Sequence, residues 1–177
     1  ILDLAKKLGA ETIKRPKLLS TDQSSSEDGW LHAIKEIKKK ESIDYVIALQ
    51  ATSPIRGKED LKNAINLLID NNCDSLVSTS KRDAHFTWDK IGQKLIPNYS
   101  LKTKRKRRQS IREKYIENGS FYIFSVKKFL ILKIRLFGKI INYNQDKIKG
   151  FELDKKEDIL LIETIFKNTP KKYNIIN

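Results

Sequence analysis

The sequence predicts an α/β domain in which helices cover both faces of a mostly parallel sheet, giving three layers. Short apolar runs rich in β-branched residues alternate with amphipathic stretches, which is the pattern of β-α-β units. The run at residues 43–49 is too short for an ordinary helix and leads directly into a polar turn. The length of 177 residues suits one domain, so we expect a single domain over residues 1–168 and a frayed tail over residues 169–177.

The first half of the chain is predicted to hold three helices and two strands. Apolar residues follow helical spacing over residues 1–8, and Gly9 stands where a helix commonly ends. The remaining elements are a brief strand over 12–14, a helix over 26–40 capped by Ser24 to Ser26, a buried central strand over 43–49 and a helix from about residue 58 to 71.

The second half continues the alternation after an interruption. A strand is predicted at residues 76–80, but residues 81–112 carry little periodicity and predict hairpins and a long loop. The later elements are a strand over 120–125, a helix over 126–135, a strand over 139–143 and a last helix after Asp154. Asp154 and Glu157 have the spacing of a capping box for that helix.

Composition limits the class of protein and its partners. The net charge of +14 favours an acidic partner, such as a nucleotide, a sugar acid, a nucleic acid or an anionic membrane. Cys73 is the single cysteine, which excludes an internal disulfide, and two histidines add too little for a metal cluster. No run reaches the roughly 18 apolar residues of a membrane helix. We therefore expect a cytoplasmic protein with no membrane partner.

The start of the chain predicts a fragment. The sequence begins with isoleucine and contains no methionine, and its first predicted helix has no strand before it. We therefore expect the first strand of the sheet to be missing.

Polar residues follow two of the predicted strands in patterns that suit ligand binding. The turn from Leu49 to Arg56 places amide, hydroxyl and guanidinium groups beyond a strand end, where open α/β sheets bind ligands. Arg15 ends the strand over 12–14, and its planar guanidinium suits a nucleotide. The hydroxyls of Ser20 to Ser26 lead into a helix N-terminus, another place for polar ligand groups. A plain helix cap and an exposed turn arginine would also explain the last two observations.

Glu152 and Asp154 form an acidic couple near the C-terminus. They are two residues apart on a predicted strand end, so both side chains point to the same face and can share one cation. Mg²⁺ takes one or two protein carboxylates and fills its other positions with water and phosphate oxygens. The alternative is that Asp154 only caps the last helix and Glu152 lies on the surface.

The densest positive run lies at residues 102–109. Such a run also occurs in nucleic-acid-binding patches, but no aromatic residue for base stacking is interleaved with these charges. An anionic small ligand is favoured, and Arg108 is the residue that we expect to hold a carboxylate in bidentate fashion. Asn118-Gly119 is a turn signal that also begins a strand.

Taken in order, six pieces of the sequence resemble the CMP-sugar cytidylyltransferase family, of the acylneuraminate (CMP-sialic acid synthetase-like) type. The pieces are Arg15-Pro16, Ser24 to Ser26, Leu49 to Arg56, Arg107 to Gln109, Asn118 to Tyr122 and Glu152 to Asp158. The resemblance implies a Rossmann-like fold of the nucleotide-diphospho-sugar transferase type. It also implies transfer of CMP from CTP to a nonulosonic (sialic-acid-like) sugar, with release of pyrophosphate.

The resemblance further implies roles for individual residues. Arg15 and Ser26 would bind the nucleotide, and Glu152 and Asp154 would hold Mg²⁺. Arg108 would hold the sugar carboxylate and act in catalysis together with Asp154. The implied sugar pocket consists of Gln50, Lys81, Arg108, Gln109, Asn118 and Tyr122. Members of the family are usually homodimers, and we predict residues 126–143 as the dimerisation segment.

The sequence departs from the family at two places. The phosphate-binding loop, a Gly/Ser/Lys/Arg-rich turn after the first strand, is absent, so we expect this segment alone to be inactive. Glu152 stands where the family usually has Asp. Two alternatives stay open, namely a nucleic-acid-binding basic α/β module and a cytidylyltransferase for another sugar acid such as Kdo. Arg107 to Gln109 together with Asn118-Gly119 favour the sialic-acid type. The lack of aromatic residues within 102–109 favours no nucleic-acid partner.

Overall fold

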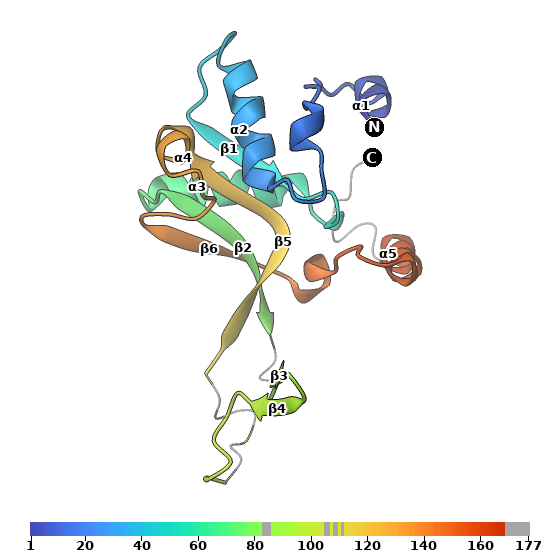
Figure 1. Cartoon of the computed structure of the whole chain (residues 1–177), viewed down its shortest axis with the longest axis vertical. Coiled ribbons are helices and arrows are strands. Elements are labelled where there is room, and N and C mark those ends of the chain that lie inside the picture. Colours follow the sequence, from blue (N-terminus) through green and yellow to red (C-terminus); the bar gives the residue numbers. More distant parts are fainter. Residues whose placement is uncertain (83–85, 105–106, 108–109, 111, 169–177) are drawn as a thin grey trace.

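The structure, a computed structural model, describes residues 1–82, 86–104, 107, 110 and 112–168 (Figure 1). Its elements, in chain order, are α1 (Leu2–Lys7), η1 (Lys17–Leu19), α2 (Ser26–Ile37), β1 (Tyr45–Leu49), α3 (Lys58–Asp70), β2 (Ser75–Arg82), β3 (Trp88–Ile91), β4 (Lys94–Pro97), β5 (Lys114–Ser125), α4 (Val126–Leu132), β6 (Ile140–Gln145), η3 (Lys147–Gly150) and α5 (Lys156–Asn168).

The main sheet has four strands in the order β1-β5-β2-β6. Strand β5 runs antiparallel to both β1 and β2, whereas β2 and β6 are parallel. Three strands therefore point one way and β5 points the other. The predicted α/β class is confirmed, but the sheet is mixed. The reason is the long connection from β2 to β5, whose described residues hold no α-helix, so the chain returns antiparallel beside β2.

Helices cover both faces of this sheet. Successive residues of β5 point to opposite faces, so Phe124 packs with Ile34 of α2 and Phe129 of α4 on one side. On the other side Phe121 packs with Leu68 of α3. These two buried clusters give the helix-sheet-helix layers that the sequence predicts.

A third cluster joins α5 to the turn after β1. Ile162 and Ile165 of α5 pack on Ile55, which is completely buried. The C-terminal helix is therefore fixed next to the polar turn, and the chain between β6 and α5 must pass beside that turn.

The amphipathic pattern places most helices correctly, with shifts at their ends. Helix α2 ends at Ile37 instead of Lys40, and its cap is Ser25, whose hydroxyl accepts a hydrogen bond from the Asp28 N–H at 3.1 Å. Gly9 follows α1 with a φ of +81°, as expected for a residue that ends a helix.

Two predicted strands differ from the structure. Thr12 to Lys14 forms no strand in the described part of the chain, because it pairs with none of the strands there. The run at residues 43–49 was expected to be buried and central, but β1 lies at the edge of the described sheet. Tyr45, Ile47 and Leu49 are consequently exposed. Strand order is set by backbone pairing and not by apolar character, and within the described sheet β1 pairs with β5 alone.

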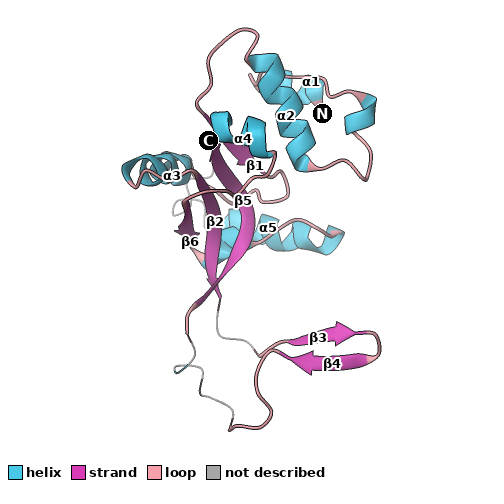
Figure 2. Ribbon diagram, turned by 60° about the vertical axis from the view of Figure 1, so that its left-hand side comes forward, coloured by secondary structure: helices cyan, strands magenta, loops and turns pink. Residues whose placement is uncertain are grey.

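The ends of β2 and β5 form an arm that leaves the rest of the sheet. Lys81 pairs with Tyr115 and Arg82 with Lys114 at its tip. In Figure 1 this twisted ribbon extends toward β3 and β4, and Figure 2 shows the β3–β4 hairpin standing apart from the main sheet. The expected hairpin within residues 81–112 is thus present as β3 and β4, which pair in antiparallel fashion.

Arg135 connects the segment after α4 to the sheet and to α2. Its guanidinium donates to both carboxylate oxygens of Glu27, at 2.6 and 3.0 Å, and lies over the rings of Trp30 and Tyr122 at 4.9 and 4.8 Å from their centroids. The contact ties residues 133–137 to the N-terminal part of α2. The hydrogen bond from Arg135 lowers the pKa of Glu27 below its ordinary value of 4.5.

Replacing Glu27 by Gln is expected to destabilise the protein by about 1 to 2 kcal/mol at pH 7, because a charged hydrogen bond of the half-buried pair is lost. Since the pKa of Glu27 is lowered by folding, its contribution is complete above about pH 4.5 and disappears as the pH falls through the folded value. Denaturant unfolding of the wild-type protein and of Glu27→Gln, from pH 7 to pH 3, measures the difference in the free energy of unfolding. A stability difference that stays constant over this range would contradict the assignment.

No helix in the described ranges is long and apolar enough to cross a membrane.

Candidate functional site

The polar turn after β1 is attached to β5 through hydrogen bonds. The Gln50 N–H donates to the Ser120 carbonyl at 3.3 Å, and the buried Ser53 hydroxyl donates to the Asn118 carbonyl at 3.4 Å. The Arg56 guanidinium donates to the carbonyls of Gln50 and Ser53 and so folds the turn back on itself. Burial lowers the pKa of Arg56. The turn is therefore a preformed structure at the carboxyl end of β1.

An irregularity in β5 faces this turn. Val77 of β2 pairs with Tyr122, but Thr79 already pairs with Glu117, so residues 118–121 form an arch between the two pairs. The Ser78 hydroxyl accepts a hydrogen bond from the Phe121 N–H at 2.9 Å inside this arch. Irregular strand pairing of this kind is common beside active sites, because it redirects side chains and backbone.

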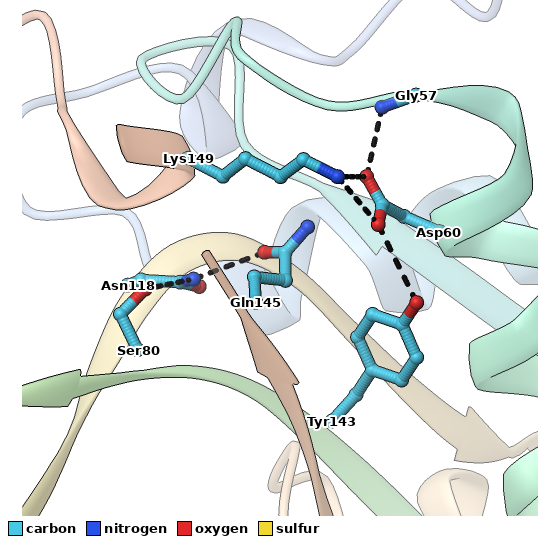
Figure 3. Close-up of polar contacts among 7 residues, drawn as sticks. All are labelled: Gly57, Asp60, Ser80, Asn118, Tyr143, Gln145 and Lys149. Atoms are coloured by element: carbon cyan, nitrogen blue, oxygen red, sulfur yellow. Dashed lines mark hydrogen bonds and ion pairs between the residues drawn. The ribbon is translucent and has the colours of Figure 1, made fainter. Parts of the chain in front are cut away.

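Asn118 connects three strands from inside the arch. Its amide nitrogen donates to Ser80 Oγ of β2 at 3.0 Å and to Gln145 Oε1 of β6 at 2.9 Å, and its Oδ1 accepts from the Ser120 N–H at 3.3 Å (Figure 3). The residue is 2% exposed. Both amide hydrogens are thus committed to protein partners, so the direct geometric role of Asn118 is to link β5 to β2 and to β6. Its predicted role in sugar binding stays a prediction.

Glu152 and Gln50 meet over Gly119. A Cβ added to Gly119 would lie 2.6 Å from Gln50 Oε1 and closer still to Glu152 Oε1. Gly119 also has a φ of +63°, a conformation that glycine adopts without strain. The Leu153 N–H donates to the Thr52 carbonyl at 2.7 Å. The acidic segment near the C-terminus therefore lies against the polar turn, as expected if both belong to one site.

Asp154 carries an exposed carboxylate next to this contact. Its N–H and that of Lys155 donate to the Asp158 carboxylate, at 2.9 and 2.7 Å. Helix α5 begins at Lys156, so the predicted capping box of Asp154 and Glu157 is wrong: Asp158 supplies the cap instead. The Asp154 side chain is consequently not used for capping and remains open to solvent.

Arg15 and Ser26, the predicted nucleotide residues, lie at one hollow of about 220 Å³ on α2. The guanidinium of Arg15 lies over Gly29, where an added Cβ would be 3.4 Å from Nη1, and the same nitrogen donates to the Leu19 carbonyl at 3.2 Å. The other residues that line the hollow are Ile13, Trp30, His32 and Ala33. Arg15 and Ser26, which the family resemblance assigns to the same ligand, are thus close together in the structure.

Tyr122 is buried beneath the Arg135 guanidinium. Its hydroxyl donates to Glu117 Oε2 at 2.8 Å. Burial raises the pKa of Tyr122, and the hydrogen bond to Glu117 raises it further, so the phenol stays protonated at neutral pH. Tyr122 joins α2, β5 and Arg135, and its predicted contact with a sugar is not tested by this geometry.

Of the remaining predicted sugar residues, Lys81 lies on the arm. Lys81 forms an ion pair with Glu113, and it is exposed where its neighbour Ser80 is buried. Arg108 and Gln109 lie outside the described residues. The predicted meeting of Arg108 with the acidic couple therefore stays a prediction.

The donor set around Glu152 suits a hard cation. Two carboxylates, from Glu152 and Asp154, are within two residues of each other, and oxygen donors are what Mg²⁺ prefers. Among the described residues no group of three or more His, Cys, Asp or Glu gathers to form a metal site. A Mg²⁺ ion at this position would therefore take at most this couple from the protein and complete its shell with water and phosphate.

Sequence reasoning missed an ion pair that lies beside the same segment. Lys149 of η3 donates to both carboxylate oxygens of Asp60 in α3, at 2.8 and 2.7 Å (Figure 3). A lysine in a chain with 36 basic residues gives no signal of burial, so this pair could not be found without the fold.

No family model matches the chain, but several known proteins are similar to it. The N-acylneuraminate cytidylyltransferase of Oncorhynchus mykiss is 32% identical over 127 residues, which are 69% of this chain and 28% of that protein. The N-acylneuraminate cytidylyltransferase A of Danio rerio is 29% identical over 151 residues, which are 82% of this chain and 34% of that protein. This chain thus spans about a third of the length of these relatives or less.

Bacterial proteins match over more of the chain at lower identity. The post-translational flagellin modification protein B of Campylobacter coli is 26% identical over 180 residues, which are 94% of this chain and 73% of that protein. Several of these relatives are named cytidylyltransferases, which are a class of nucleotidyltransferase. The matches and the order of the site residues together support the assignment of this chain to the CMP-sugar cytidylyltransferase family.

Proposed function

We propose that the protein transfers CMP from CTP to the anomeric hydroxyl of a nonulosonic, sialic-acid-like sugar and releases pyrophosphate. The observation that carries the proposal is the convergence of Glu152 and Gln50 over Gly119, with the exposed Asp154 carboxylate beside them. Acidic and amide groups thus share the carboxyl edge of one sheet, where α/β folds bind nucleotides and sugars. The names of the relatives, which state a cytidylyltransferase for N-acylneuraminate, support the same reaction.

The residues divide into two groups by the substrate that each would bind. Arg15 and Ser26 at the hollow on α2 would bind the cytidine nucleotide. The sugar side would be formed by Gln50, Lys81, Arg108, Gln109, Asn118 and Tyr122. A guanidinium such as that of Arg108 binds a carboxylate through two parallel hydrogen bonds, which selects for a sugar acid.

The chemistry asked of the protein is mainly orientation and charge compensation. Glu152 and Asp154 would hold Mg²⁺, which neutralises charge on the phosphate oxygens during the displacement of pyrophosphate. The preformed turn after β1 holds Gln50 in place before substrate arrives, so little reorganisation is needed on binding. Asn118 links β5 to β2 and β6 beneath this site.

The test is pyrophosphate release by the longest form of the protein that its gene encodes. With CTP, Mg²⁺ and N-acetylneuraminic, legionaminic or pseudaminic acid, we expect pyrophosphate and a CMP-sugar with at least one of the acids. Turnover with Kdo alone would move the proposal to another sugar-acid substrate. A folded protein that makes no pyrophosphate with any of these acids would contradict it. Nucleic-acid binding that persists at physiological salt would favour the basic-module alternative.

We also propose a homodimer formed through residues 126–143. Val126 and Phe129 of this segment are buried in the core, but Ile131, Ile134 and Ile140 are exposed. Exposed apolar side chains that gather in one segment are typical of a protein interface.

Replacing Ile134 by Glu is expected to convert a dimer into a monomer, because the charge would have to be buried in the interface. Light scattering coupled to size-exclusion chromatography measures the mass. Ile91 of the β3–β4 hairpin is also exposed and serves as the comparison. A dimer that survives Ile134→Glu but dissociates with Ile91→Glu would place the interface on the hairpin and contradict the proposal.

A further inference from the structure

The ion pair between Lys149 and Asp60 is more buried than the other ion pairs with described geometry. Its side chains are 15% and 10% exposed, whereas Lys128 and Asp74, another Lys–Asp pair, are 50% and 25% exposed. Asp60 Oδ2 also accepts the Gly57 N–H at 2.9 Å, and Oδ1 accepts the Tyr143 hydroxyl at 3.4 Å. Figure 3 shows the lysine reaching from η3 to the start of α3. The carboxylate thus has partners from α3, β6 and η3.

Stability alone is a weak explanation for such a pair. Removing two charges from water costs several kcal/mol, and their attraction often does no more than recover that cost. The start of α3 needs only the acceptor that Asp60 offers to Gly57, not the ammonium group. What the ammonium group adds is a charged tie from η3 to the start of α3, beyond the packing of η3 against β2 and β5.

The segment that η3 leads into carries Glu152 and Asp154. Gly150 lies against β2 and β5, where an added Cβ would be 2.9 Å from Ser80 Oγ and 3.4 Å from Asn118 Cβ. The next fixed point is the hydrogen bond from the Leu153 N–H to the Thr52 carbonyl at 2.7 Å. Together with the packing of Ile148 on the Ile55 cluster, Lys149 and these contacts determine where Glu152 lies against Gly119.

We propose that Lys149 and Asp60 are positioning residues that hold the segment 150–154 against the turn after β1, and so set the geometry of the Glu152–Asp154 couple. Neither residue touches substrate. The inference rests on the proposed function only in its consequence for catalysis. The placement itself is a property of the protein without substrate or metal. The proposal predicts that the two opposite charges, and not only the packing of the two side chains, are needed to hold segment 150–154 in place.

The experiment uses three variants and two readouts. Lys149→Met leaves the Asp60 charge buried without its partner. This variant therefore combines two effects, the loss of the ion pair and a loss of stability. The double variant Asp60→Asn with Lys149→Met removes both charges, keeps an acceptor for Gly57, and is expected to regain most of the thermal stability. Lys149→Arg retains the charge. Lys128→Met, which breaks the exposed pair with Asp74, is the matched control.

The first readout is amide hydrogen exchange of residues 150–154 without metal or substrate. We expect exchange at Leu153 to speed up by about tenfold or more in the double variant and to stay unchanged in Lys128→Met. The second is the Mg²⁺ concentration for half-maximal activity, which we expect to rise by about 10- to 100-fold in the double variant, as for outer partners of metal ligands. Lys149→Arg should restore both values at least in part.

The two proposals can fail separately. If the double variant is folded and shows wild-type exchange at Leu153, the positioning role is overturned, whatever the activity. Unchanged exchange together with a lowered melting temperature would identify a stabilising pair and overturn it as well. If exchange responds as expected but the wild-type protein makes no pyrophosphate with any sugar acid, the positioning role stands and the proposed function fails.

Discussion

Replacing Asp154 by Asn should lower kcat by about a hundredfold or more while leaving the fold intact. Under the proposed function the Asp154 carboxylate holds Mg²⁺, and charge stabilisation by a bound metal contributes several kcal/mol to the transition state. The amide has no negative charge and is a much poorer ligand. Steady-state kinetics of pyrophosphate release, with Mg²⁺ varied, measures the effect.

The same substitution is expected to change the free energy of unfolding by less than about 0.5 kcal/mol, since the side chain is exposed and the cap of α5 comes from Asp158. Glu157→Gln removes an exposed acid three residues away and is the control, with unchanged kcat. If Asp154→Asn unfolds the protein, or if Glu157→Gln lowers kcat equally, Asp154 has no special role in the site.

Replacing Gly119 by Ala should lower both stability and activity. The new methyl group would overlap the Glu152 carboxylate and lie 2.6 Å from Gln50 Oε1, so that both side chains must move. The positive φ of +63° adds backbone strain of about 1 to 2 kcal/mol. A displacement of about 1 Å in a catalytic arrangement can cost a hundredfold in rate, and we expect a loss of at least about tenfold.

Gly92→Ala separates strain from displacement. Gly92 has a similar φ of +60°, but an added Cβ would meet nothing within 4 Å. The Gly92→Ala variant should be destabilised by a similar backbone strain, and it should keep full activity. Urea unfolding measures the loss of stability in each variant, and the pyrophosphate assay measures the loss of activity. Equal activity of the two variants would show that the positions of Glu152 and Gln50 against Gly119 are irrelevant to turnover.

Local sequence patterns predicted the elements whose structure depends on local interactions. The apolar face of α2 and the run of β1 follow from side-chain periodicity, and the structure places both within a few residues of the prediction. The sequence places the acidic couple on a strand end, but Glu152 and Asp154 lie in an irregular stretch after η3, beyond the end of β6 at Gln145. The Leu153–Thr52 hydrogen bond, which joins distant parts of the chain, holds this stretch against the turn after β1.

The features that were not predicted depend on pairing between distant parts of the chain. β1 lies at the edge because pairing, not hydrophobicity, sets strand order. Asn118 reads as a turn residue in the sequence, yet the arch in β5 turns its side chain inward to Ser80 and Gln145. The Lys149–Asp60 pair joins residues 89 positions apart, and neither residue type indicates burial.

The most direct test of the central claim is a crystal structure of the longest encoded form with CTP and Mg²⁺. We predict Mg²⁺ bound by the carboxylates of Glu152 and Asp154 and by a phosphate oxygen of CTP, with the nucleotide extending toward Arg15 and Ser26. CTP bound at another surface, or a metal ion that touches neither carboxylate while the nucleotide occupies the hollow on α2, would contradict it.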